Sequence, residues 1–412
     1  MSVCIKKISV FSIWFFGIFS LFPNEKRGVL FIVLILASIF SLIKGKKIKF
    51  HKLVLINSIL FLIYLLALSY SSDILVAAKR FETASSIMIA PVVFSFFYYN
   101  QKVVFSEKNK LLFFKVLHWS NIAFMFVIIT FYLKIRYVDQ QVEYGYFLSH
   151  LERRLPFLND HPIYISIIFS ISVIFSTCYI LTRKQSVKFN YIYGVSAFLM
   201  FLLILFLSRK GVILALIISL TLIFVFYKKN NLKIIILASI AFFFLVTSLL
   251  FFIPQTNKRI SEMFDKATYV NKNETNSTSN RLQIYKCAID LIKEKPIFGY
   301  GIEDDRKALY QCFKERLYYL YEFRFNTHNQ YLSIVMKVGL FGLLAFLFFL
   351  GYNLKMATIT NDWLFVGIIV FFSIIMFFEN ILERQNGVML FSFLINYLAF
   401  KNSLLLDRKN KI

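Results

Sequence analysis

The stretch NTHNQYLSIVMKVGLFGLL, residues 326–344, marks the point where a long polar segment gives way to apolar sequence. A helix that begins near Thr327 would place His328 at the surface of a membrane. The free backbone N–H groups and the positive dipole end of such a helix favour an anion or a polarised hydroxyl beside the imidazole. The alternative interpretation of His328 is an ordinary polar residue at a membrane boundary, so the surrounding sequence has to decide between the two.

The composition around this stretch is that of a polytopic membrane protein. Of the 412 residues, 58% are hydrophobic and only 17% are charged, which is too apolar for a soluble domain of this length. Apolar runs of about 16 to 23 residues recur, close to the length that a helix needs to cross a bilayer. We therefore expect an all-α fold with about twelve transmembrane helices and one large helical loop before the tenth. The predicted spans are residues 8–22, 28–43, 53–69, 82–98, 111–133, 162–182, 189–207, 211–227, 233–253, 329–350, 363–380 and 386–400.

The basic residues set the expected orientation of these spans. The first apolar run follows Lys6 and Lys7 and has no small-residue cleavage site, so we interpret it as a retained span and not as a signal peptide. An even number of spans places both termini on one side. The basic clusters of the loops fall on that side, which the positive-inside rule assigns to the cytoplasm. The net charge of +25 is explained in this way, and nucleic-acid binding is excluded.

Three regions follow from this layout. Residues 1–253 hold the first nine spans, residues 254–328 form a domain on the periplasmic side, and residues 329–412 hold the last three spans and a cytoplasmic tail. The middle region is the part of the chain that is large enough to form a small domain outside the membrane.

Two features of the middle region predict local structure. Ser279 and Asn280 are good N-cap residues for a helix that runs from residue 281 to about residue 293. Arg281 would then lie in the first turn, where a cation opposes the helix dipole by about 0.3 to 1 kcal/mol unless an anion lies nearby. Cys287 and Cys312 share this region, and we expect a disulfide between them if the region is extracytoplasmic.

Arg209 and Lys210 are the clearest exception to the charge rule, because they lie in a short turn between two spans on the outer side. They could be a snorkelling pair that ends a helix, or an anion site that faces a cavity. Arg281 and His328 fall on the same side by the same span count. The sequence therefore predicts that Arg209, Arg281 and His328 converge at one outer site, where two guanidinium groups suit a diphosphate and an imidazole suits a general base.

Further candidates flank the outer ends of spans. Charged residues in or beside apolar sequence often face a cavity, so Arg80, Glu379 and Glu383 are expected to line the same site, and Asn329 adjoins the histidine. The acidic run at residues 303–305 is interpreted as a solvated loop, and the four cysteines lack metal-ligand spacing. We predict no metal and no cofactor.

Three pieces of the chain resemble one known family. They are SRKGVILAL from Ser208, SNRLQIYKCAIDLIKEKPIFGYG from Ser279 and THNQYLSIVMKVGLFGLL from Thr327. In this order and spacing they resemble the O-antigen ligase and O-antigen polymerase superfamily of bacterial membrane glycosyltransferases. The resemblance implies metal-independent glycosyl transfer at the periplasmic face of the inner membrane, from a polyprenyl-diphosphate-linked glycan to a sugar hydroxyl.

The resemblance also implies roles for the three converging residues. Arg209 and Arg281 match the paired arginines that hold the donor diphosphate. His328 matches the catalytic histidine that deprotonates the acceptor hydroxyl, with inversion at the anomeric carbon. The chain departs from the family in an aromatic-rich insert at residues 318–325, where acceptor contacts are expected.

Alternative functions stay open at this point. A ligase would pass the glycan to lipid A-core, whereas a polymerase of O-antigen, capsule or exopolysaccharide would pass it to the next lipid-linked repeat. The histidine-asparagine motif and its spacing favour the ligase. A transporter of lipid-linked sugars would spread its charges along a path through the membrane, but here they gather at the outer mouth, and the sequence shows no clear inverted repeat.

Overall fold

The computed structural model describes residues 2–141, 143–155, 158, 160–182, 187–227 and 277–409. All regular structure in these residues is helical, and no strand occurs among them. The predicted all-α fold class is confirmed. The predicted span at residues 233–253 and the part of the predicted outer domain before residue 277 lie outside the described residues.

Seven helices of the described residues are long and apolar enough to cross a membrane. A bent pair, in which α5 and α6 meet at 44°, would make an eighth span. The seven are α2 (Gly28–Gly45) with the short turn before it, α7 (Glu107–Leu133) with the turn after it, α9 (Pro162–Thr182), α10 (Val187–Phe206), α11 (Lys210–Tyr227), α18 (Gln330–Ile359) and α20 (Gln385–Lys409). The shorter helices among the first hundred residues and before α20 are α1 (Ser2–Phe16), α3 (Lys52–Asn57), α4 (Ile59–Ala67), α5 (Ile74–Ala84), α6 (Ser86–Asn100) and α19 (Trp363–Ile375).

The predicted count of about twelve spans is not reached in the described residues, because several apolar runs form short or broken helices. The predicted span 53–69 is split into α3 and α4 at Asn57 and Ser58. There the Asn57 side chain bonds Asn396 of α20 at 2.8 Å and Asn353 of α18 at 2.9 Å. Apolar periodicity does not show such a break, because the buried asparagines that favour it come from distant parts of the chain.

Helix α18 is broken near its middle, at Val338 and Gly339. The loop that follows α15 fills the break: the N–H groups of Tyr300 and Gly301 donate to carbonyls of α18 at 2.7 and 2.9 Å, and Leu340 N–H donates to Pro296 at 2.8 Å. Gly339 has φ +68°, and a Cβ there would lie 1.8 Å from the Ile297 carbonyl oxygen. Only glycine fits this close approach. Two of the sequence pieces that carry the family resemblance are therefore in direct contact.

A small helical subdomain stands beside the first half of α18. It consists of α15 (Ser277–Glu294), α16 (Asp304–Arg316) and α17 (Tyr318–Glu322). Its own core is formed by Ile284, Ala288, Leu309, Phe313, Leu320 and Met336.

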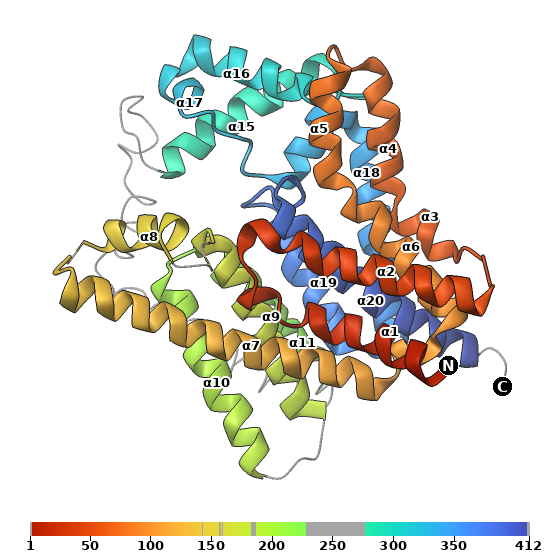
Figure 1. Cartoon of the computed structure of the whole chain (residues 1–412). Coiled ribbons are helices and arrows are strands. Elements are labelled where there is room, and N and C mark those ends of the chain that lie inside the picture. Colours follow the sequence, from red (N-terminus) through yellow and green to blue (C-terminus); the bar gives the residue numbers. More distant parts are fainter. Residues whose placement is uncertain are drawn as a thin grey trace.

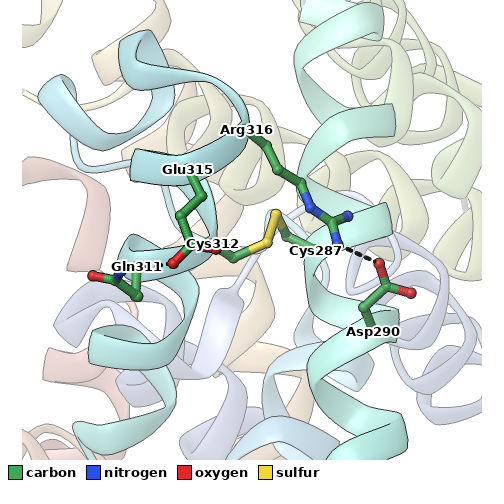
Figure 2. Close-up of a disulfide and its surroundings, with 6 residues drawn as sticks. All are labelled: Cys287, Asp290, Gln311, Cys312, Glu315 and Arg316. Carbon is green, nitrogen blue, oxygen red and sulfur yellow. Dashed lines mark hydrogen bonds and ion pairs between the residues drawn. A yellow bond between two sulfur atoms is a disulfide. The ribbon is translucent and has the colours of Figure 1, made fainter.

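A disulfide fastens this subdomain. Figure 2 shows Cys287 of α15 joined to Cys312 of α16, with the Cα atoms 6.0 Å apart. Beside it, Arg316 bonds Asp290 at 2.8 Å, so an ion pair ties the same two helices. The predicted pairing of the two cysteines is confirmed.

Two predicted helix starts need correction. Helix α15 already includes Ser277, so Ser279 and Asn280 lie inside it, and Arg281 is beyond its first turn. The dipole penalty expected for Arg281 is therefore smaller than predicted, because the effect is confined to the first turn. Helix α18 begins at Gln330 and not near Thr327, with Asn329 as its N-cap.

The two ends of the molecule are distinct (Figure 1). The subdomain α15–α17 lies at one end, which we call the site end, together with the connection between α4 and α5. The chain termini lie at the other, which we call the opposite end. At the site end Ser72 donates its backbone N–H to Asp304 at 2.6 Å, so the α4–α5 connection is fastened to the start of α16.

Candidate functional site

The turn that follows α19, residues 377–380, is where distant segments meet at the site end. The Arg281 guanidinium of α15 donates to the Phe378 carbonyl at 3.5 Å. The Tyr285 hydroxyl, one helical turn further along α15, donates to the Phe377 carbonyl at 3.2 Å and to the His328 carbonyl at 3.5 Å. Helix α15 and the segment before α18 are thus held against the same turn.

His328 lies directly over this turn. Its Nδ1 is 3.6 Å from Glu379 Oε2 and makes no hydrogen bond within the described residues. Its backbone has φ +46°, in the left-handed region that a non-glycine residue seldom adopts, and its N–H donates to the Asn326 side chain at 2.9 Å. Such a conformation costs of order 1 kcal/mol and persists only where the surroundings impose it. The side chain is still 27% exposed, so the imidazole is fixed in place yet open to a ligand.

The segment of Arg209 and Lys210, at the start of α11, lies beside the same turn. Lys210 is the first residue of α11, and Gly211 packs so closely on Phe378 that an added Cβ would lie 2.6 Å from its ring. The preceding Ser208 has φ +51°, a second left-handed residue at this place. The structure therefore places the segment that carries Arg209 beside the turn that accepts Arg281 and faces His328.

Glu379 is the carboxylate at the centre of this arrangement. Burial alone would raise its pKa, but the neighbouring His328, His161 and Arg384 outweigh burial and hold the pKa below its usual range. The group is 7% exposed and ionised at neutral pH.

His161 is a second histidine at the site. Burial lowers its pKa, and the charge of Arg209 lowers it further. Its backbone N–H donates to Asp160, which forms a fully buried ion pair with Arg27. No role for Asp160 or His161 follows from the sequence alone. Their contribution depends on Arg27, which no local pattern connects to them.

Arg80 and Glu383 belong to a neighbouring charge cluster and not to the surroundings of His328. The Glu383 carboxylate accepts from Lys337 at 2.6 Å and from Arg306 at 2.9 Å, and Arg80 pairs with Glu303. These groups line a cavity of about 60 Å³.

A single asparagine links the charge cluster to the segment of His328. The Asn380 amide donates to Glu383 at 3.0 Å and to the Thr327 hydroxyl at 2.9 Å. Thr327 directly precedes the histidine, so the two groups of residues are neighbours joined through one side chain.

Asp305 is the unusual member of the charge cluster. It is 4% exposed, and its Oδ1 makes no hydrogen bond within the described residues. Burial raises the pKa of Asp305 to about 7; nearby Lys337 lowers it, whereas Glu383 and Glu303 raise it. Lys337 and Arg306 were not predicted as site residues. A lysine in the apolar sequence of a predicted span was the available signal for Lys337, because such charges seldom face lipid.

Asn329 has a local role in the structure. Its Oδ1 accepts the N–H groups of Tyr331 and Leu332 at 3.0 and 3.1 Å and so caps α18. The residue is 9% exposed. Its amide oxygen is therefore committed to the start of the helix that positions His328.

Across the parts of the chain that the structure describes, no group of three or more His, Cys, Asp or Glu side chains is arranged to hold a metal ion.

Comparison with known proteins gives one match. A family model described as O-antigen ligase matches residues 195–347. This range begins in α10, contains Arg209, Arg281 and His328, and ends in α18 beyond its break. No curated protein matches the chain. The matched range and the apolar helices together indicate a membrane protein.

Proposed function

We propose that the chain, whose residues 195–347 match a family model described as O-antigen ligase, belongs to the O-antigen ligase superfamily and is a ligase that transfers a polyprenyl-diphosphate-linked glycan to a sugar hydroxyl of lipid A-core. The observation that carries the proposal is the meeting of three segments at one turn. Arg281 contacts this turn, Glu379 belongs to it, and His328 lies over it.

The arginines would hold the donor. A planar guanidinium binds two phosphate oxygens at once, so Arg209 and Arg281 can neutralise a diphosphate as it leaves. Within the described residues, the Arg281 guanidinium makes one long hydrogen bond of 3.5 Å to a carbonyl, and anionic oxygens are stronger acceptors than that carbonyl. We propose that these two cations, and no metal, stabilise the leaving group. Lys210, at the start of α11, adds a third positive charge.

His328 would act as the general base. The acceptor oxygen attacks the anomeric carbon, the bond from that carbon to the diphosphate oxygen breaks, and its electron pair leaves with the diphosphate. The proton of the acceptor hydroxyl passes to the imidazole, and Glu379 stabilises the imidazolium that forms. Attack in line with the leaving group inverts the anomeric centre.

The site end would face the periplasm of a bacterial inner membrane, with both termini in the cytoplasm. Two observations support this orientation. The basic loops predicted as cytoplasmic follow the positive-inside rule, and the Cys287–Cys312 disulfide at the site end suits an oxidising compartment. The donor and acceptor lipids would reach the site from the outer leaflet.

A repeat-unit polymerase is the second candidate, because it needs the same diphosphate grip and the same base. The spacing of the histidine and Asn329 favours the ligase. Deletion in the producing strain separates the two: loss of all capped lipopolysaccharide indicates a ligase, whereas retention of lipopolysaccharide capped by a single repeat indicates a polymerase.

The direct test is transfer by purified protein reconstituted with a lipid-diphosphate glycan and an acceptor. His328→Ala should lower turnover by about 10²- to 10⁴-fold, the usual contribution of a positioned base. Arg281→Lys keeps the charge but loses the planar fork, so it should also impair turnover. Arg408→Lys, at an exposed position near the end of α20 and away from the site, is the matched control. Full activity of His328→Ala would rule out the general base, and a wild-type protein that moves the lipid without transferring the glycan would indicate a transporter.

A further inference from the structure

An apolar groove runs along the outside of the helix pair α18 and α19. Its volume is about 550 Å³. The lining residues that matter here are Tyr331, Leu347, Gly351 and Leu354 of α18 together with Ile374 and Phe377 at the end of α19.

The groove has almost no polar group to offer a ligand. The Ser373 hydroxyl donates to the Ile369 carbonyl at 2.8 Å, and the Tyr331 hydroxyl donates to the Ser373 carbonyl at 2.7 Å. Both hydroxyl protons are thus used inside the protein. A polar ligand would lose its hydrogen bonds to water in such a groove without replacement, whereas a hydrocarbon chain would lose nothing.

One end of the groove adjoins the candidate site. The rings of Tyr331 and Phe377 lie 4.4 Å apart and form this end. The Phe377 carbonyl accepts the Tyr285 hydroxyl, and the next carbonyl, that of Phe378, accepts Arg281. The position proposed for the diphosphate and the start of the groove are therefore one residue apart along the same turn.

The dimensions and exposure of the groove suit a long lipid chain. Beyond the break, the lining residues of α18 run from Leu343 to Leu354, which is about 16 Å at the usual rise of a helix and about half the thickness of the hydrocarbon core. Leu347 is 45% exposed and Phe377 is 51% exposed. The groove is therefore open along its side and can be entered from the bilayer.

We propose that this groove binds the polyprenyl chain of the donor. The inference rests on the proposed function, because that function places a diphosphate at Arg281. A single long chain attached to a diphosphate matches an apolar groove that begins beside a guanidinium. The groove then selects donors by the length of the chain, while the arginines bind the headgroup.

Gly351 offers a way to fill the groove without distorting the protein. A Cβ added there meets no atom within 4 Å. Gly351→Leu should raise the KM for a long-chain polyprenyl-diphosphate glycan by at least about tenfold, with little change in kcat, because lost ground-state binding appears in KM. The KM for a donor that carries the same glycan on a two-isoprene diphosphate should not change, because that chain is too short to reach Gly351.

The matched control is Gly194→Leu in α10, which is the same substitution in another apolar helix. There the nearest atom to an added Cβ is Ile180 Cδ1 at 3.9 Å, so the substitution causes no clash, and Gly194 lies outside the groove. Both donors should be used by this variant as by the wild type. A Gly351→Leu variant with an unchanged KM for the long-chain donor overturns the proposal, and so does one in which both KM values rise equally.

A second measurement separates failure of the groove from failure of the proposed function. A photoreactive long-chain polyprenyl diphosphate should crosslink to α18 and α19 in the wild type and much less in Gly351→Leu. Competition by unlabelled polyprenyl diphosphate but not by phospholipid supports the proposal, and equal competition by phospholipid overturns it. If the wild type transfers no glycan from either donor, the proposed function fails, and the crosslink still decides whether the groove binds polyprenyl chains.

Discussion

Buried carboxylates with two cationic partners occur at both ends of the molecule. At the opposite end, Asp362 accepts from Lys110 at 2.8 Å and from Lys401 at 3.2 Å. At the site end, Glu383 accepts from Lys337 at 2.6 Å and from Arg306 at 2.9 Å. Each arrangement joins helices that are far apart in sequence, and each keeps its carboxylate ionised by holding the pKa far below its usual range against the effect of burial.

The two ends differ in whether their buried charged and titratable groups all have partners. A cavity of about 410 Å³ adjoins the opposite-end cluster, but all four of its charged groups are paired, since Lys401 also binds Glu107. At the site end, Asp305 Oδ1 and His328 Nδ1 are buried atoms without a hydrogen bond. A fully satisfied network stabilises a fold, whereas unsatisfied buried atoms cost free energy unless a ligand uses them. The amide of Asn402 at the opposite end also has both atoms without a hydrogen bond in the described residues, so the contrast holds for the charged and titratable groups: those of the opposite-end cluster serve to hold the helices together, whereas Asp305 and His328 keep atoms that a ligand can use.

Breaking the opposite-end cluster should have the largest effect on stability. Asp362→Ala leaves Lys110 and Lys401 buried without this counter-charge, and loss of one partner of a buried pair costs about 3 to 5 kcal/mol. Thermal unfolding of the purified protein in detergent measures it. Glu107→Ala is the control: its side chain is 57% exposed, so the expected loss is no more than about 1 kcal/mol. Equal losses in the two variants would contradict the distinction between buried and exposed partners.

The disulfide provides the next effect. Replacing Cys287 and Cys312 together by Ser should destabilise the subdomain by about 3 kcal/mol, the scale expected for a loop of this size. The loss should be local, because the subdomain has its own core. Hydrogen exchange should show weaker protection in α15–α17 with little change in α7 or α20. Cys4→Ser removes an exposed free cysteine and should change nothing. Uniform loss of protection across the whole chain would show that the subdomain does not unfold by itself.

The sequence predicted the elements of the fold better than their continuity. Apolar runs identified helices throughout the described residues, because burial in lipid is a property of composition. The breaks were missed: that of α18 depends on the close approach of Ile297 to Gly339, and the end of α3 lies beside asparagines from two other helices. Such contacts join residues distant in the chain, which no periodicity can reveal.

The sequence predicted some residues of the candidate site but not the partners that they bind. Counting spans was enough to put Arg209, Arg281 and His328 on one side, and the structure brings their segments to one turn. Glu379 was expected to line that site and does lie beside His328. Glu383 was expected to line the same site as His328, but it lies in the neighbouring charge cluster. Its partners there, Lys337 and Arg306, come from two further helices, α18 and α16.

Removing the charge at Glu379 should have a smaller effect that appears in turnover. Glu379→Gln keeps the shape of the side chain but loses the charge that stabilises an imidazolium at His328. We expect kcat to fall by about 10- to 100-fold, which corresponds to about 1.4 to 2.7 kcal/mol in the barrier. The KM for the donor should stay unchanged, because the arginines still bind the diphosphate. A raised KM with an unchanged kcat would assign Glu379 to donor binding instead.

A further effect tests the unsatisfied atom at the site end through pH. Because burial raises the pKa of Asp305 to about 7, the folded protein keeps a proton that the unfolded chain, with a pKa of about 3.9, has released. The stabilisation by this proton is complete below about pH 4 and is lost as the pH rises to about 7. Asp305→Asn stays neutral, so its stability should fall by about 4 kcal/mol less than that of the wild type over this range, because about three pKa units correspond to about 4 kcal/mol; unfolding midpoints measure the difference.

The neighbouring aspartate should behave in the opposite way. Burial would raise the pKa of Asp304, but its hydrogen bonds with Ser72 and the charge of Lys307 lower it below the usual range. This carboxylate therefore contributes stability above the unfolded pKa that is lost as the pH falls through the folded pKa, and Asp304→Asn should be less stable than the wild type at neutral pH. If the stability of the two variants differs from that of the wild type in opposite directions as the pH rises, the carboxylate without a hydrogen-bond partner is that of Asp305. If both variants differ from the wild type in the same direction, Oδ1 of Asp305 has a hydrogen-bond partner in solution. The contrast between the two ends would then rest on His328 alone.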